Sequence, residues 1–317
     1  MPLSNNHKSG FVLVSILWVT VMLSLLVLGF GRRAALDRRA AAYSLDQTQA
    51  MMMARGAVDR GIVELQNHAT VRRILPEEYH ENLRMGASWV QSMNLFLEGY
   101  FEQREMFQHD EVIYVIIDEE RYIDINNAPD EILEAIPSLS RSAIRRIRAR
   151  LAREGHSNEE RTPFNAIEEL QYIRGVSEDD WFGTERTPGL RNILTVWSDD
   201  GRINVNTAPR EVLACIPDLS SGDIEAILHY RAGSDGDLYT RTDRSFANMN
   251  DLSEKTGITG DSLRALEKYC KTTSSYFRIR GVATRRNGRI RAVCEAVVSM
   301  RQGMSNILEW QEKTLGS

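Results

Sequence analysis

The sequence of 317 residues is poor in the residues that build metal and redox sites. Its three cysteines, Cys215, Cys270 and Cys294, lie far apart and form no C-x-x-C pair, and its six histidines include no H-E-x-x-H pair. The spacing therefore argues against the zinc-finger, thiol-redox and zinc-protease classes. Cys270 and Cys294 could form a disulfide in an exported body, but the odd number of cysteines favours buried thiols.

Catalytic signatures and a strong charge of one sign are also missing. The sequence contains no G-x-S-x-G elbow, no Walker loop and no dinucleotide fingerprint with the right flanks. Acidic pairs are common, but they lie in predicted turns, where solvated charge is expected. With 39 Lys and Arg against 44 Asp and Glu, the net charge is only −5, so no overall field attracts nucleic acid. We therefore predict that the protein is not an enzyme.

What the sequence does contain, near its start, is a run of 20 residues without a charge, Phe11 to Phe30 (FVLVSILWVTVMLSLLVLGF). As an α-helix this run is about 30 Å long, which matches the hydrocarbon core of a bilayer. It is too long and too apolar for the core of an ordinary secretory signal, and no small-x-small cleavage site follows it. It follows a short polar leader, MPLSNNHKSG, that ends at Gly10. The run therefore predicts a membrane-spanning helix.

The predicted helix continues beyond the apolar run. Residues 32–68 are rich in good helix formers, no proline occurs before Pro76, and apolar residues recur at three- and four-residue steps. We predict one helix from Phe11 to about residue 66, roughly 80 Å long, with its first half in lipid and its second half packed on a soluble domain. A plain signal anchor with a helical stalk is the alternative interpretation.

The junction between Gly10 and Phe11 resembles the type IV prepilin signal. In that family a membrane peptidase cuts after the glycine and methylates the new N-terminal phenylalanine, which implies cleavage between Gly10 and Phe11 here. Ordinary members carry Glu at the fifth mature position, where this sequence has Ser15. This departure, together with the large body, resembles the minor pseudopilin K family of type II secretion systems.

The resemblance implies a function and a location. It implies a subunit that is processed by prepilin peptidase and caps the tip of a periplasmic pseudopilus with the I-type and J-type minor pseudopilins. Its other expected partners are the major pseudopilin and the inner-membrane assembly platform, and the system exports folded proteins across the outer membrane. The chain would cross the bacterial inner membrane once, with its bulk in the periplasm. The positive-inside rule alone predicts the opposite orientation, because Arg32, Arg33, Arg38 and Arg39 follow the span.

The body contains an internal repeat with an offset of 80 residues. Ile123–Pro129 (IDINNAP) aligns with Ile203–Pro209 (INVNTAP), and the β-branched run 112–117 aligns with 192–197. We predict that each copy is a β-hairpin followed by four short helices, with Asn127 and Thr207 as helix caps. A last hairpin is predicted around Asn287-Gly288, the strongest short-range hairpin signal in the chain.

The copies also resemble helix-hairpin-helix modules, which often bind DNA. Neither copy has the glycine pair that lets a hairpin approach phosphate closely. A run of arginines could still contact phosphates, although a solvated helix face or a subunit interface is favoured: Arg141, Arg145, Arg146, Arg148, Arg150 and Arg153. Nucleic acid is therefore not an expected partner. A membrane-anchored helix-hairpin-helix protein of the competence type that binds DNA, and an ordinary anchored scaffold, remain the alternative functions.

One glycine-rich loop carries three carboxylates, Asp235, Asp237 and Asp243. Carboxylate oxygens on such a loop could bind Ca²⁺, although the loop lacks the glycine and the final glutamate of an EF-hand. The resemblance to K pseudopilins, which are known as calcium-binding proteins, also implies Ca²⁺. A mobile polar loop without metal is the alternative.

The predicted fold class is α+β, with a long N-terminal transmembrane helix, a pilin-like α/β core with antiparallel strands, and an inserted, duplicated helix-hairpin-helix (SAM-like) helical domain. The predicted segments are a leader (1–10), the transmembrane half of the helix (11–30), its periplasmic half (31–68), the opening portion of the pilin-like core with a β-hairpin (69–126), the first helical repeat (127–190), a core β-hairpin (191–206), the second helical repeat (207–270), and a C-terminal β-hairpin and tail (271–317).

Overall fold

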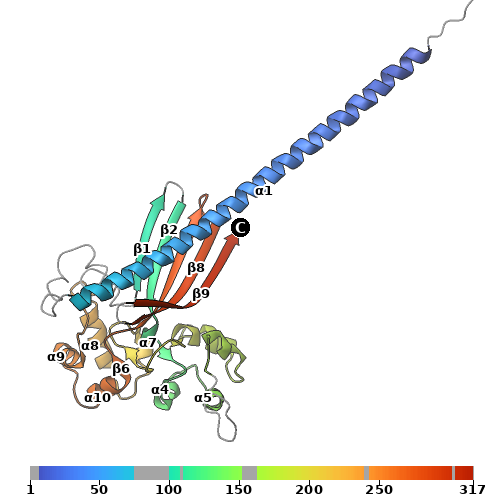
Figure 1. Cartoon of the computed structure of the whole chain (residues 1–317). Helices are drawn as coiled ribbons and strands as arrows, with labels where there is room; N and C mark the ends of the chain where they lie inside the picture. The colour runs from blue at the N-terminus through green and yellow to red at the C-terminus, as the bar shows by residue number, and fades with distance from the viewer. Residues whose placement is uncertain are drawn as a thin grey trace, which may run out of the picture.

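The computed structural model of the chain describes residues 7–74, 100–107, 110–151, 163–238, 243–301 and 304–316. A long helix stands out from a body that contains an antiparallel sheet and a group of short helices (Figure 1). The predicted mixture of a long N-terminal apolar helix and an antiparallel sheet is confirmed. Residues 1–6 of the predicted leader and most of the segment 69–110 lie outside the described residues or their described side chains.

The long helix, α1, spans His7–Ile74 and has 68 residues, which makes it about 100 Å long. It is longer than the predicted helix at both ends. Side chains between Phe11 and Phe30 are exposed, and burial on the sheet begins only near Asp46. Beyond that point the small and apolar residues at helical spacing are buried, as predicted: Ala50, Ala54, Ala57, Val58, Ile62 and Leu65.

The main sheet has five antiparallel strands in the order β1-β2-β7-β8-β9. Their bounds are β1 Tyr100–Phe107, β2 Asp110–Asp118, β7 Tyr276–Arg285, β8 Ile290–Arg301 and β9 Met304–Gly316. The predicted hairpin around Asn287-Gly288 is confirmed, with positive φ angles of 56° and 86° at these residues. The sequence predicts the edge strand β9 only as a tail. Its signal is weak because it is mostly polar and its register shifts opposite Val297 and Val298.

The second half of α1 lies across one face of this sheet (Figure 1). Its small residues allow a close approach, and Gly281 on β7 lies directly beneath them. A Cβ atom at Gly281 would be 2.2 Å from the carbonyl oxygen of Ala54 and 3.0 Å from the Cβ of Ala57. At Gly281 the helix and the sheet therefore meet through glycine and alanine, whereas larger side chains such as Ile62 and Ile279 fill other parts of the same interface.

The remaining body consists of short elements that follow the two sequence repeats. Within the described residues, four helical segments follow the strand β3 in the first copy and the strand β5 in the second copy, as predicted. The first copy contains η1 Glu119–Arg121, β3 Ile123–Asp124, α4 Asp130–Glu134, α5 Arg141–Leu151, η2 Ile167–Tyr172 and α6 Glu178–Phe182. The second copy contains η3 Leu190–Asn192, β4 Leu194–Thr195, β5 Ile203–Asn204, α7 Arg210–Leu213, α8 Ser221–Arg231, α9 Met249–Thr256, α10 Gly260–Tyr269 and β6 Cys270–Lys271.

The hairpins predicted to open each copy, within 112–126 and 191–206, are wrong. The turn η1 takes the chain out of the sheet after Asp118, so β2 pairs with β1 and β7 instead of with β3. The short strand β3 pairs in parallel with β4, and β5 pairs in parallel with β6. The pair β5–β6 therefore joins the two ends of the second copy, and the pair β3–β4 joins the start of the first copy to the segment that directly follows its helices.

Equivalent side chains make the same hydrogen bonds in both copies. The amide of Asn126 accepts from the backbone N–H of Phe164 (2.8 Å) and donates to its carbonyl oxygen (3.0 Å). Asn206 makes the same two bonds to Phe246, at 2.8 and 2.9 Å. This shared asparagine of the aligned motif thus anchors the loop that leads into the third helical segment of each copy.

All three cysteines are free and buried. Burial raises the pKa of the Cys215 and Cys294 thiols to about 11 and that of Cys270 to about 12. Cys270 lies in β6 and Cys294 in β8, in different sheets, so the disulfide considered from the sequence does not form.

Candidate functional site

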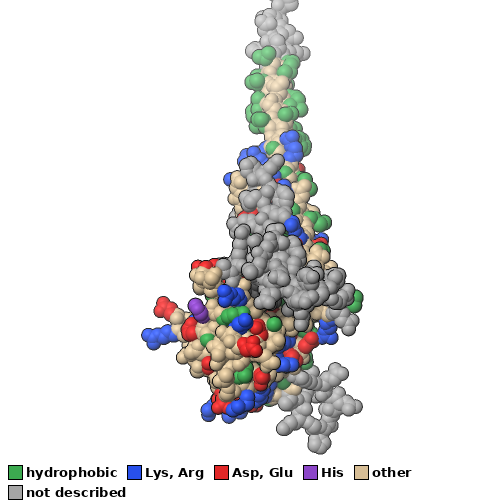
Figure 2. Space-filling model, turned by 90° about the vertical axis from the view of Figure 1, so that its left-hand side faces the viewer, with side chains coloured by type: hydrophobic (Ala, Val, Ile, Leu, Met, Phe, Trp, Pro, Cys, Tyr) green, Lys and Arg blue, Asp and Glu red, His purple; other side chains and the backbone are tan. Residues whose placement is uncertain are grey.

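The exposed first half of α1 is the first candidate site. Gly10 and Phe11 are consecutive residues of this helix, and the side chain of Phe11 is exposed. Apolar side chains line the visible face of the rod in the space-filling view (Figure 2). Ser15, at the position where a pilin carries Glu, donates a hydrogen bond to the carbonyl oxygen of Phe11 (2.9 Å). Within the described residues, this is the helix long and apolar enough to cross a membrane.

A second apolar surface continues along α1 on the side that faces away from the sheet. Leu45, Met52 and Val63 are half or more exposed. At 100° per residue they point within about 20° of one direction, opposite the buried alanines. Gly56 lies on the same side, with no atom near enough to touch an added Cβ. This stripe has the small and apolar character that a neighbouring helix can pack against.

Buried polar groups join the sheet to the helical body. Asp118, at the end of β2, is 1% exposed and accepts hydrogen bonds from the Asn204 amide (2.9 Å), the Thr207 hydroxyl (2.7 Å) and the Ser274 hydroxyl (2.6 Å). Burial raises the pKa of Asp118, although these hydrogen bonds oppose the rise. One carboxylate thus ties the sheet to both ends of the second copy.

The next two residues extend this junction. Glu120 is fully buried and binds the Lys271 ammonium (2.6 Å) and the backbone N–H of Ser275 (2.6 Å). Burial alone would lower the pKa of Lys271, but its ion pairs with Glu120 and Asp200 outweigh burial and raise it. The prediction that this acidic turn is solvated is wrong. Its carboxylates are buried because each finds a donor on the helical body.

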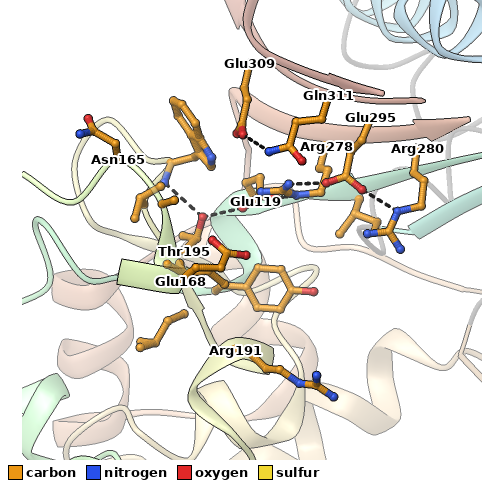
Figure 3. Close-up of a pocket in the computed structure, with 17 residues that line it drawn as sticks. Glu119, Asn165, Glu168, Arg191, Thr195, Arg278, Arg280, Glu295, Glu309 and Gln311 are labelled. Carbon is orange, nitrogen blue, oxygen red and sulfur yellow. Dashed lines mark hydrogen bonds and ion pairs between the residues drawn. The ribbon is translucent and has the colours of Figure 1, made fainter. Parts of the chain in front are cut away.

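A hollow of about 270 Å³ lies beside this junction, between the sheet and the first copy (Figure 3). The Arg278 guanidinium spans part of its wall, bonded to Glu119 (2.5 Å) and Glu295 (2.6 Å). Arg280 also binds Glu295 (2.6 Å). Burial would lower the pKa of Arg278, but the two carboxylates outweigh burial and raise it. The Arg278–Glu119 pair connects the sheet to η1, and the two pairs with Glu295 connect β7 to β8 within the sheet.

The comparison with known families bears on residues 203–270, which run from β5 to the start of β6. This segment matches the family model "Type II secretion system (T2SS), protein K". The resemblance to the protein K family that the sequence predicts is confirmed over these residues. The matched residues make up about a fifth of the chain and form the second copy of the repeat.

No curated protein sequence matches the chain. Among solved structures, the chain is similar to one described as the GspK-GspI-GspJ complex from the type 2 secretion system of enterotoxigenic Escherichia coli. The sequence identity is 11% and the TM-score is 0.48, and the similarity covers 80% of this chain and 99% of the other.

The structure does not assemble a calcium site from the three carboxylates that the sequence predicts as ligands. Asp235 and Asp237 are exposed in the loop after α8, whereas Asp243 is buried. Among the described residues, no three Asp, Glu, His or Cys side chains lie close enough together to hold a metal ion. Residues 239–242 of the loop are outside the described residues. Calcium binding therefore stays a prediction.

Several arginines of α5 contact the protein itself. Arg146 donates to the carbonyl oxygen of Arg174 (2.7 Å), Arg148 pairs with Asp130, and Arg150 pairs with Glu169. The sequence favours a solvated helix face or a subunit interface for this run, and Arg146 is exposed in agreement with the first, whereas Arg148 and Arg150 are half-buried in ion pairs within the first copy. Their guanidinium groups stabilise the first copy internally. Arg153 lies outside the described residues.

Proposed function

We propose that the chain is a minor pseudopilin that caps the tip of a type II secretion pseudopilus. The match of residues 203–270 to the protein K family carries this proposal. The architecture supports it, because one helix has an exposed apolar half for the membrane and a second half that packs on an antiparallel sheet. The proposed cargo is folded protein that crosses the outer membrane.

The proposed assembly uses the two exposed surfaces of α1. Prepilin peptidase cuts between Gly10 and Phe11 and methylates Phe11. The freed helix then packs with the helices of the I-type and J-type minor pseudopilins through the stripe of Leu45, Met52 and Val63, which faces away from the sheet. Ser15 leaves the fifth mature position without a carboxylate, which fits a subunit at the end of the filament. The major pseudopilin and the inner-membrane platform complete the expected partners.

The helical body supplies the cap in this proposal. We interpret its two copies as a duplicated helix-hairpin-helix module, supported by the matching Asn126 and Asn206 hydrogen bonds. Its width beside the sheet would obstruct the addition of a further subunit (Figure 1). The body lies in the periplasm in this assignment, although the arginines after the span favour the other side by charge alone.

The mature N-terminus tests this proposal. Intact mass of the full chain extracted from membranes should show the loss of residues 1–10 and the gain of one methyl group. Gly10→Leu should leave the full precursor, because a bulky side chain then occupies the cleavage position. Gly31→Ala is the matched control, since nothing lies within 4 Å of an added Cβ there, and it should be cut normally. A wild-type protein that retains Met1, or a Gly10→Leu protein that begins at Phe11, would overturn the proposal.

Calcium binding is a separate proposal with its own test. Asp235 and Asp237 lie on a loop in which Gly233 and Gly236 have positive φ angles, and their oxygens suit a hard cation. Removing Ca²⁺ with EDTA should lower the melting temperature of the full chain, and Asp235→Ala should abolish that response. Asp261→Ala, at an exposed site on α10, should retain it. Identical melting with and without EDTA would contradict calcium binding.

A further inference from the structure

A cluster of cationic side chains follows the membrane-spanning part of α1. We call Arg32, Arg33, Arg38 and Arg39 the arginine collar. Asp37 is the one acidic residue between Phe30 and residue 45, so the local net charge is +3. All four arginines are exposed on the helix. Figure 2 shows Lys and Arg side chains gathered where the apolar section of the rod ends.

The collar surrounds the helix instead of lying on one face. With 100° per residue, the four arginines leave no empty sector wider than about 140° around the axis. A neighbouring helix contacts only one side of α1, so it could neutralise only part of this charge. A surface that encircles the helix can contact every member of the collar. This distribution favours a lipid surface over a single protein partner.

The position of the collar along the axis fits the same surface. Arg32 comes two residues after Phe30, and Arg39 lies about 10 Å further along the helix. The polar layer of a bilayer adds about 5 to 7 Å on each side of the hydrocarbon core. Long arginine side chains can also bend toward that layer while their stems remain on the helix. Arg32 and Arg33 therefore lie at headgroup depth when Phe11–Phe30 fills the core, and Arg38 and Arg39, whose backbone lies about 12 to 14 Å beyond Phe30, contact the same layer by bending their side chains back toward it.

We infer that the arginine collar binds the headgroups of anionic phospholipids in the leaflet from which the body projects. This inference rests on the proposed membrane insertion of α1 but not on a place at the pseudopilus tip. Anionic headgroups attract each arginine near the surface, and salt screens the attraction. The collar then fixes the depth of the helix, because a shift in either direction removes arginines from the headgroup layer.

Trp18 reports on this contact because it lies within the span, whereas the other described tryptophans lie in the body. The full chain is reconstituted in vesicles that mix phosphatidylcholine with phosphatidylglycerol, and either lipid carries brominated chains that quench tryptophan. The wild type should prefer phosphatidylglycerol by about threefold, and the preference should fall toward one in about 0.5 M salt. A quadruple variant, R32Q/R33Q/R38Q/R39Q, should show no preference.

A second quadruple variant controls for total charge. Arg141, Arg145, Arg174 and Arg186 are exposed on the helical body, and their replacement by Gln should leave the lipid preference unchanged. Equal quenching by both lipids in the wild type would overturn headgroup binding by the collar while leaving membrane insertion intact. A preference for phosphatidylglycerol that persists in the collar variant would also overturn headgroup binding by the collar. Absence of Trp18 quenching by either lipid would instead remove the proposed span. If the collar variant loses association with other pseudopilins and keeps its lipid preference, its partner is a protein.

Discussion

Gly281→Val should detach α1 from the sheet. An added Cβ would be 2.2 Å from the Ala54 carbonyl oxygen and 3.1 Å from a methyl group of Val58, and the first of these atoms belongs to helix backbone. The whole helix would have to move, because backbone cannot rotate away as a side chain can. Valine itself suits a β-strand better than glycine, so strand propensity opposes the loss. We expect the free energy of unfolding to fall by about 3 kcal/mol or more.

Thermal melting of the detergent-solubilised full chain, followed by near-ultraviolet circular dichroism, measures this effect. Gly56→Ala is the matched control on the opposite face of α1, because no atom lies within 4 Å of the added Cβ. Alanine in a helix interior should stabilise the protein by about 1 kcal/mol. If Gly281→Val melts at the wild-type temperature, α1 does not pack on β7 as described.

Asp118→Ala should weaken the joint between the sheet and the second copy. The variant leaves the Asn204 amide and the Thr207 and Ser274 hydroxyls without their shared acceptor at a buried site. Each buried polar group left unpaired costs about 1 to 3 kcal/mol, although Asn204 and Ser274 also bond to each other, so we expect a loss of about 4 kcal/mol. The melting curve should broaden or split, because the sheet and the helical body would unfold less cooperatively. Asp261→Ala, in an exposed ion pair, should change stability by less than about 0.5 kcal/mol.

The pH dependence of stability, compared between the wild type and Asp118→Asn, distinguishes the effect of the charge on Asp118 from the effect of its size and shape. Burial raises its pKa in the folded protein above 3.8, so the folded state takes up a proton at higher pH than the unfolded chain. The stability linked to this proton is present at low pH and is lost as the pH rises through the folded pKa. The wild type should therefore gain stability relative to Asp118→Asn as the pH falls from about 7 to about 4. A wild type that loses stability relative to Asp118→Asn over this range would contradict the raised pKa.

Elements with strong local signals were predictable from the sequence. The charge-free run from Phe11 to Phe30 and the helical spacing beyond it predicted α1, and Asn287-Gly288 predicted the β7–β8 turn. The two opening hairpins failed for a physical reason. Strand propensity at 112–117 is satisfied equally well by β1 and β7, and β7 lies far away in sequence, so local pattern could not select the partner.

The residues of the candidate sites also differ in whether a local sequence signal predicts them. Gly10 and Phe11 could be predicted as a processing site because the proposed signal consists of consecutive residues, whereas the Asp118 junction joins positions up to 156 residues apart. An acidic turn next to a β-branched strand carries no local sign of burial. Thr207 illustrates the limit, since its hydroxyl was expected to cap a helix and instead binds Asp118, while Pro209 occupies the N-cap position. This hydrogen bond forms because the second copy packs against the end of β2, a tertiary contact that the local sequence around Thr207 does not indicate.

The chain leaves the main sheet at Asp118 and returns at Tyr276, and Asp118 is the register partner of Phe277. The points where the chain leaves and rejoins the sheet are therefore adjacent. The residues between them form an insertion that could be lengthened, exchanged or deleted without changing the order of the strands in the main sheet. Such a connection would allow the size and shape of the helical body to change while α1 and the main sheet keep their geometry. Any replacement for the helical body would then have to supply hydrogen-bond donors to the buried carboxylates of Asp118, Glu119 and Glu120.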